Sequence, residues 1–235
     1  MDINWLGLAC FRIRGSQAVI INDPFPPDSG YTLGKQTADI VTVSHQHPSH
    51  SYVEGVTGPP RVIRGPGEYE ISSVLILGQR TYHDAVKGQS RGKNTAYLME
   101  VDGVTICHLG DIGHVIGDEQ LEAMGKVDIL LIPVGGVSTI TAAMAAETIR
   151  KVEPKIVIPM HYQTAGSKRE LEPLETFLKE MGQSAIEPKP KLNVNKNNLP
   201  LTMQVVILAI YFSAAAYAAV FPTNGLALPC DKSYS

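Results

Sequence analysis

The chain has 235 residues, of which 44% are hydrophobic and 18% are charged, and it contains 21 glycines and 16 prolines. This composition is typical of a globular protein with many turns, and it excludes disordered, coiled-coil and fibrous proteins. The 20 basic and 23 acidic residues leave a formal net charge of −3, so the protein lacks the positive field that gathers nucleic acid or acidic lipid.

Predicted strands come first along the chain, and predicted helices appear later. Short apolar runs broken by turn residues indicate strands at residues 3–6, 10–13, 18–21, 40–44, 74–77, 96–101, 104–108, 129–133, 156–159 and 205–208. Helical patterns follow at residues 118–124, 141–152 and 168–181. This order predicts one layered domain of sheets and helices over residues 1–208.

The residues after 208 form an apolar tail, residues 209–235, which we treat separately from the domain. If residues 205–208 are the closing strand, the apolar run that remains, 211–221, is too short to span a bilayer. The alternative is a membrane anchor over residues 201–221, which would remove a strand and expose its neighbour. We therefore favour a tail that packs as a helix on the body or on a partner, with membrane association as the alternative.

Cysteine content and the amino terminus predict a cytoplasmic protein. Cys10, Cys107 and Cys230 lie far apart without C-x-x-C spacing, and an odd number of cysteines argues against a disulfide framework. The first residues lack the basic stretch and apolar run of a secretory signal. We expect a protein of the reducing cytoplasm.

The most specific pattern is the sequence HQHPSH at residues 45–50, directly after a predicted strand. Imidazole is the commonest metal ligand in proteins. Because a strand end is rigid and the following loop can turn side chains inward, His45 and His47 could share one ion while His50 faces a neighbouring one. The alternative interpretation is a solvated polar loop, which three histidines in six positions disfavour.

Further candidate ligands lie elsewhere in the chain. His83, His108, His114 and His161 are the remaining histidines, and Asp111 follows the predicted strand 104–108. A carboxylate at that strand end could bridge two cations. Taken singly, a strand-end aspartate is more often a turn or cap residue, and His108 or His114 is more often a supporting or surface group than a ligand.

Nine further segments agree, in order, with one known family. On these segments and the 45–50 loop, the chain resembles the metallo-β-lactamase superfamily of metal-dependent hydrolases, in particular its branch of small bacterial proteins that includes the ascorbate-phosphate lactonase. The resemblance covers residues 2–208 and implies an α+β fold, the four-layer αββα sandwich with a metal site at one edge. The segments are WLG at 5–7, CFR at 10–12, DPF at 23–25, ADIV at 38–41, GPGEYE at 65–70, RGKNT at 91–95, HLGD at 108–111, PVGG at 133–136 and PMHY at 159–162.

The resemblance also implies a set of metal ligands and a cofactor. One or two divalent ions are expected, with zinc first and manganese or iron as alternatives. One metal would be bound by His45, His47 and His83, the second by His50 and His161, and Asp111 would bridge the two.

Three positions depart from the family pattern. Ser49 stands where the family usually has an aspartate ligand of the second metal, and a neutral hydroxyl leaves more positive charge uncompensated. We therefore expect a weakened second site. Leu8 stands where the family tends to have histidine, and Thr141 where it tends to have aspartate near the first long helix; together the three changes raise the chance of altered or lost activity.

The implied function is hydrolysis of a small ester, lactone or phosphoester by a metal-bound hydroxide. Asp111 would orient the water and His114 would assist proton transfer, both as catalytic residues, while Glu68 and Tyr162 would contact the small-molecule substrate. One alternative is a degenerate metal-binding or interaction protein without catalysis. Another is a nuclease, which the net charge of −3 and the lack of a basic stripe disfavour.

Overall fold

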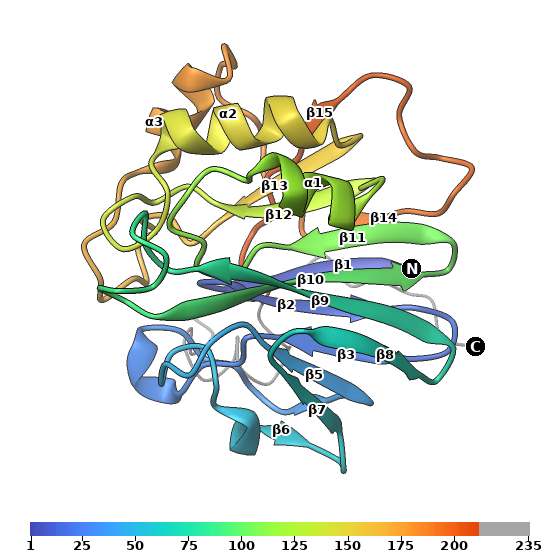
Figure 1. Ribbon diagram of the computed structural model, residues 1–235. Helices are drawn as coiled ribbons and strands as arrows, with labels where there is room; N and C mark the ends of the chain where they lie inside the picture. The colour runs from blue at the N-terminus through green and yellow to red at the C-terminus, as the bar shows by residue number, and fades with distance from the viewer. Residues whose placement is uncertain (212–235) are drawn as a thin grey trace, which may run out of the picture.

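The computed structural model describes residues 1–211, which form two mixed β-sheets packed against each other, with helices on the outside (Figure 1). The first sheet has six strands in the order β14 (Leu192–Asn193), β1 (Asp2–Gly7), β2 (Cys10–Arg14), β3 (Val19–Asn22), β5 (Ile40–Val43) and β7 (Arg61–Arg64). The second has seven, in the order β15 (Gln204–Val205), β13 (Ile156–Met160), β12 (Ile129–Pro133), β11 (Val104–His108), β10 (Lys93–Val101), β9 (Val74–Tyr82) and β8 (Gly67–Ile71).

Burial along the strands follows their position in the sheets. The parallel strands β12 and β13 are buried at every residue, as expected where both faces of a sheet are covered. Buried positions instead tend to alternate with more exposed ones along β9, and none of the residues of β8 at the sheet edge is fully buried. The apolar inner faces of the two sheets, together with the helices, form the main core.

Helices cover the outer face of the seven-stranded sheet (Figure 1). They are α1 (Asp118–Met124), α2 (Ala142–Val152) and α3 (Leu174–Glu180). The outer layer over the six-stranded sheet is built differently among residues 1–211: it contains two 3-10 helices, Pro27–Ser29 and Val53–Gly55, and the strand pair β4 (Gln36–Thr37) and β6 (Val56–Thr57). This layer covers a second, smaller apolar cluster.

The helix predicted over residues 168–181 is shorter than expected, because α3 begins only at Leu174. Proline disfavours the helical conformation of the residue before it, and Pro173 precedes the first helical residue. The preceding backbone is held elsewhere, since Leu171 N–H donates to Gln163 Oε1 and Glu172 N–H donates to Gly135 O. These hydrogen bonds hold the loop before α3 outside the helix, close to the loops that follow the strands of the sandwich.

Residues 201–211 include a short edge strand and isolated backbone contacts, and no helix. Gln204 and Val205 form β15, which is shorter than the strand predicted over residues 205–208, and Ala209 N–H still donates to Lys189 O. No helix within residues 1–211 is long and apolar enough to cross a membrane. The predicted tail lies outside the described residues from position 212 onward, as does Cys230.

One edge of the sandwich collects the ends of strands that run in the same direction. In the first sheet β3 is parallel to β5, and in the second β9, β11, β12 and β13 point the same way. Hydrogen bonds join the two sheets here: Thr95 N–H donates to Ser44 O, and His161 N–H donates to Leu8 O, at 2.9 and 3.1 Å. Loops that follow these strands therefore meet at one place.

Candidate metal centre

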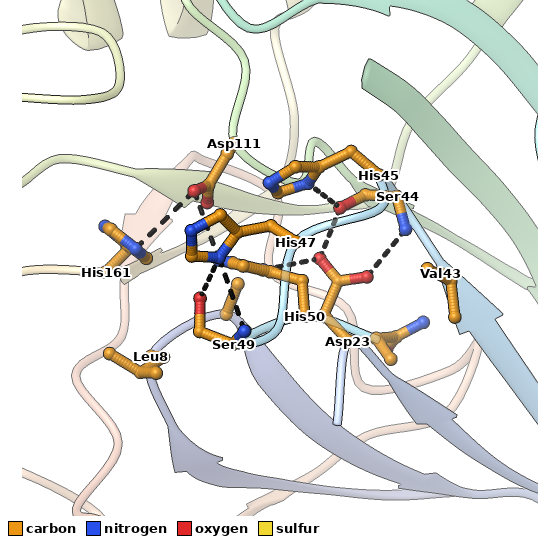
Figure 2. A network of polar contacts seen from close by, with 12 residues as sticks. Leu8, Asp23, Val43, Ser44, His45, His47, Ser49, His50, Asp111 and His161 are labelled. Carbon is orange, nitrogen blue, oxygen red and sulfur yellow. Dashed lines mark hydrogen bonds and ion pairs between the residues drawn. The ribbon is translucent and has the colours of Figure 1, made fainter. Parts of the chain in front are cut away.

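The loop after β5 turns three imidazoles to one side. The backbone N–H of His47 donates to His45 O at 3.0 Å, and that of His50 donates to His47 O at 2.9 Å. These tight turns bring one ring nitrogen of each histidine within 4.8 Å of the others. Figure 2 shows the three rings gathered at the end of the strand.

Three further side chains reach the same place from the second sheet. Asp111 follows β11, and its Oδ2 lies 3.1 Å from His50 Nε2, 3.5 Å from His83 Nε2 and 3.6 Å from His161 Nε2. His83 follows β9 and His161 follows β13. Potential ligand atoms lie within 4.8 Å of one another in His45–His83–Asp111 and in His50–Asp111–His161. The structure thus brings together all six predicted ligands, here called the His/Asp cluster, with His47 grouped with His45 and His50 and not with His83.

Several buried atoms of this cluster have no hydrogen-bond partner among the described residues. They include His83 Nδ1, His161 Nε2 and Asp111 Oδ1. A buried polar atom without a partner costs about 1–3 kcal/mol. Imidazole and carboxylate are also the donor types that zinc, manganese and iron accept. A divalent cation fits this cluster, because it would supply the partner that these atoms lack.

Protonation in the cluster is set by burial and by two carboxylates. Burial lowers the pKa of His45 to about 3 and that of His161 to about 4, so both rings are neutral at pH 7, which is the form that binds metals. Burial also lowers the pKa of His50, but Asp111 and Asp23 outweigh it and raise that pKa to about 10. Binding of a cation through His50 therefore requires the loss of its proton.

Asp23 is a supporting residue that sequence reasoning did not assign to the site. It follows β3 and is completely buried. Its Oδ1 accepts a hydrogen bond from Ser44 N–H at 2.7 Å, and its Oδ2 accepts from Ser44 Oγ at 2.5 Å and lies 3.1 Å from His50 Nδ1 (Figure 2). A carboxylate on the far nitrogen of a metal-binding histidine fixes the orientation of the ring. The DPF segment was a signal for this position, although not for the contact.

Asn94 holds the backbone of Asp111 in place. Its Oδ1 accepts from Asp111 N–H at 3.1 Å, and its Nδ2 donates to Thr81 Oγ1 and to Leu109 O. Gly110, between Leu109 and Asp111, has a φ of +57°. A Cβ atom at this position would be only 2.5 Å from Ser44 Cβ. A glycine is therefore required where the two sheets approach each other.

Arg169 also reaches the cluster, from the loop that was predicted to be helical. Its Nη2 donates to Ser49 Oγ at 2.9 Å, and that oxygen lies 2.8 Å from His47 Nδ1. Arg169 forms no ion pair with a carboxylate of residues 1–211. The place where the family usually has an acidic ligand is thus occupied by a hydroxyl next to a guanidinium. Nothing in the sequence indicates this contact, because the two residues are 120 positions apart.

Three predicted site residues are not brought into the cluster. The ring of His114 is engaged by the backbone, since Nδ1 donates to Val115 O and Nε2 accepts from Tyr82 N–H. Glu68 is exposed on the edge strand β8 and lines a different cavity. Tyr162 is buried and packs against Trp5, with ring centroids 5.0 Å apart.

Two of the three departures from the family pattern have structural roles. Thr141 caps α2, where its hydroxyl accepts from Met144 N–H at 3.3 Å. Leu8 is buried, and its carbonyl accepts from both Trp5 Nε1 and His161 N–H. The Ser49 departure places a hydroxyl in hydrogen-bond contact with a member of the cluster, His47.

Comparisons with known proteins agree with this architecture. A family model described as the beta-lactamase superfamily domain matches residues 2–161. A UPF0173 protein of Pyrococcus furiosus is 31% identical over 205 residues, which cover 79% of this chain and 93% of the relative. A UPF0173 metal-dependent hydrolase of the same organism is 30% identical over 194 residues, covering 70% of this chain and 85% of the relative.

A solved structure gives the same result. A crystal structure from Thermotoga maritima, assigned to the Zn-dependent hydrolases of the metallo-β-lactamase superfamily, superposes with a TM-score of 0.74 at 38% identity. It covers 88% of this chain and 97% of that chain. The expected fold is confirmed, while the narrower resemblance to the ascorbate-phosphate lactonase stays a prediction. The chain belongs to the metallo-β-lactamase superfamily and, within it, to the UPF0173 family of metal-dependent hydrolases.

Proposed function

We propose that this protein hydrolyses a small ester, lactone or phosphoester with one or two divalent cations, zinc first, held by the His/Asp cluster. The observation that carries the proposal is the convergence of five histidines and one aspartate from both sheets, with buried ring nitrogens and a carboxylate oxygen left without partners. The assignment of the Thermotoga maritima relative to Zn-dependent hydrolases supports zinc. When bound, such a cation acts as a Lewis acid and lowers the pKa of water from 15.7 to about 7.

The residues of the cluster have distinct tasks in this proposal. His45 and His161 present neutral ring nitrogens, because burial keeps their pKa values low. Burial raises the pKa of Asp111, but the nearby imidazoles outweigh it and hold that pKa well below its usual range. Asp111 therefore stays ionised at neutral pH and orients water by accepting a hydrogen bond, while it is a poor proton acceptor. Water adds across the acyl–oxygen or phosphorus–oxygen bond, which releases an acid and an alcohol.

A panel of lactones, thioesters and phosphodiesters tests the hydrolase proposal. We expect turnover of at least one substrate that is abolished by a chelator and restored by zinc or manganese. His47→Ala should abolish the same turnover, because it removes an imidazole of the cluster. Turnover that persists in the chelator and in the variant would contradict the proposal.

The alternative is a non-catalytic metal-binding or interaction protein, and Ser49 is the observation that favours it. Its hydroxyl contacts His47 where an acidic ligand is usual, and it accepts from Arg169. The same panel distinguishes the two functions. A chain that retains its metal and turns over no member of the panel would favour the non-catalytic alternative.

Metal stoichiometry tests the weakened second site. We expect about one tightly bound ion per chain by inductively coupled plasma mass spectrometry, rising towards two in Ser49→Asp, because the introduced carboxylate supplies negative charge beside His47. The neighbouring Arg169 would pair with that carboxylate. The increase should therefore be larger in the double variant Ser49→Asp/Arg169→Gln.

Arg169→Gln alone is the control for this comparison. It removes the guanidinium without adding a ligand, so the stoichiometry should stay at about one. Two tightly bound ions in the unmodified protein would show that the second site is not weakened.

A further inference from the structure

A cavity of about 490 Å³ lies beside the His/Asp cluster and includes one of its members, His45, in its wall. It is formed where the two sheets meet, by the residues that follow β5 and β7 and by those around the start of β10. This volume is in the range of pockets for small ligands, about 300–1,000 Å³. A molecule in the cavity would therefore touch the edge of the cluster.

The charged side chains of this cavity are all basic. Arg64, Arg91 and Lys93 line it, and no aspartate or glutamate does. None of the three forms an ion pair with a carboxylate in the part of the chain that the structure describes. Four other cavities each have at least one carboxylate in the wall. The concentration of positive charge is local, because the whole chain has a net charge of −3.

The loop between β9 and β10 fixes the position of Arg91. Asp84 accepts four backbone N–H groups of this loop, from Val86, Gly88, Ser90 and Arg91, at 2.7–2.9 Å. Burial raises the pKa of Asp84, but the four hydrogen bonds together outweigh it and lower that pKa to about 2, so the carboxylate that organises the loop stays ionised. The Arg91 guanidinium also donates to the carbonyls of Val137 and Ser138, at 3.0 and 3.1 Å.

The other two cations are carried by regular elements. Arg64 is the last residue of β7 and Lys93 the first residue of β10. Both residues are exposed, and neither forms an ion pair with a carboxylate among the described residues, so their donors can reach a ligand. The strands fix the backbone of both residues at the wall of the cavity, and charged groups held there can form charge-assisted hydrogen bonds with an oxyanion.

We propose that this cavity binds a carboxylate or phosphate group of the substrate, so that the compound hydrolysed at the His/Asp cluster is a small organic anion. The statement that the bound anion is a substrate rests on the proposed function. Anion binding by the cavity can be tested independently of that function. The anionic group lies beside His45, and the bond to be hydrolysed lies over the cluster. Net positive charge in a concave site also steers anions towards it.

The test compares two double variants of the full chain, each measured with its metal content. Arg64→Gln/Lys93→Gln removes two cations of the cavity. Arg61→Gln/Lys196→Gln removes the same charge from exposed positions outside it. Titrations with inorganic phosphate and with succinate, followed by calorimetry, should show binding to the unmodified chain that is about tenfold weaker in the cavity variant and unchanged in the control. The tighter of the two probes identifies the preferred anion.

Two results would overturn the inference: no binding of either probe to the unmodified chain, or equal binding by the two double variants. Hydrolysis supplies a separate measurement. With mono-p-nitrophenyl succinate as substrate, the cavity variant should raise KM about tenfold with kcat retained, whereas the kinetics with neutral p-nitrophenyl acetate should not change. If neither ester is hydrolysed but the loss of anion binding is confined to the cavity variant, the hydrolase proposal fails and anion binding by the cavity stands.

Discussion

In the Asp111→Asn variant, we expect at least a 100-fold loss of metal affinity and about a 10³-fold loss of kcat/KM on any substrate identified in the panel. Asp111 is the one carboxylate among the six converging side chains, and its Oδ2 lies within 3.1–3.6 Å of three imidazoles. The amide has nearly the same shape but no charge, so it removes a ligand anion without leaving a cavity. Metal content and steady-state kinetics measure the two effects.

Asp128→Asn is the matched control for this change. Asp128 is also a buried carboxylate that accepts a backbone hydrogen bond, from Thr105 N–H at 3.1 Å. It precedes β12, so it lies at the end of the strands opposite to the one where the cluster is found. The control should keep its metal and its activity. Full metal content in Asp111→Asn, with the fold intact by circular dichroism, would exclude Asp111 as a ligand.

The Asp23→Asn variant should bind metal about 10–100-fold more weakly while it keeps all six residues of the cluster. Asp23 contacts both Ser44 and the Nδ1 atom of His50. The amide has no negative charge to attract the N–H group at Nδ1 of His50. Its NH2 group would also replace an oxygen that accepts hydrogen bonds, and so would face a donor of Ser44 or His50. We also expect a loss of about 1–3 kcal/mol in the free energy of unfolding, because buried hydrogen bonds to Ser44 are disturbed.

Competition with a chelating dye measures the affinity, and urea unfolding measures the stability. Asp39→Asn serves for comparison. Asp39 also accepts a backbone hydrogen bond, from Val19 N–H at 2.8 Å, but it is exposed and precedes β5, whereas the histidines of the cluster follow that strand. It should leave the metal affinity as it is. If Asp23→Asn lowers the stability without weakening metal binding, the contact with His50 has only a structural role.

Several elements follow directly from local patterns in the sequence. The helix predicted over residues 118–124 and the strands over 104–108 and 129–133 are observed with these bounds. The strands β7 and β8 were not predicted, because they lie at sheet edges and contain charged residues at exposed positions. Such segments form strands only because a neighbouring strand supplies the hydrogen bonds.

The loop before α3 shows the opposite error. Residues 168–173 have a helical pattern, yet Pro173 and hydrogen bonds to Gln163 and Gly135 hold them outside the helix. Local propensity was outweighed here by partners that are distant in the sequence or belong to another element. This exception carries Arg169 to the cluster.

By itself, the sequence determined the chemical inventory of the protein: the histidines of residues 45–50, the further candidate ligands at strand ends, the absence of an acidic residue at position 49, and a layered domain of sheets and helices, which the family resemblance made specific as a sandwich. Side-chain types and hydrophobic periodicity are local properties, so they can be read along the chain. The tertiary structure alone decided that Asp23 contacts His50, that Arg169 donates a hydrogen bond to Ser49, and that three basic residues line a cavity with His45. These contacts join residues from different elements, up to 120 positions apart. Asp23 and His50 follow neighbouring parallel strands of one sheet, whereas the other two sets of residues come together because two sheets end at the same edge.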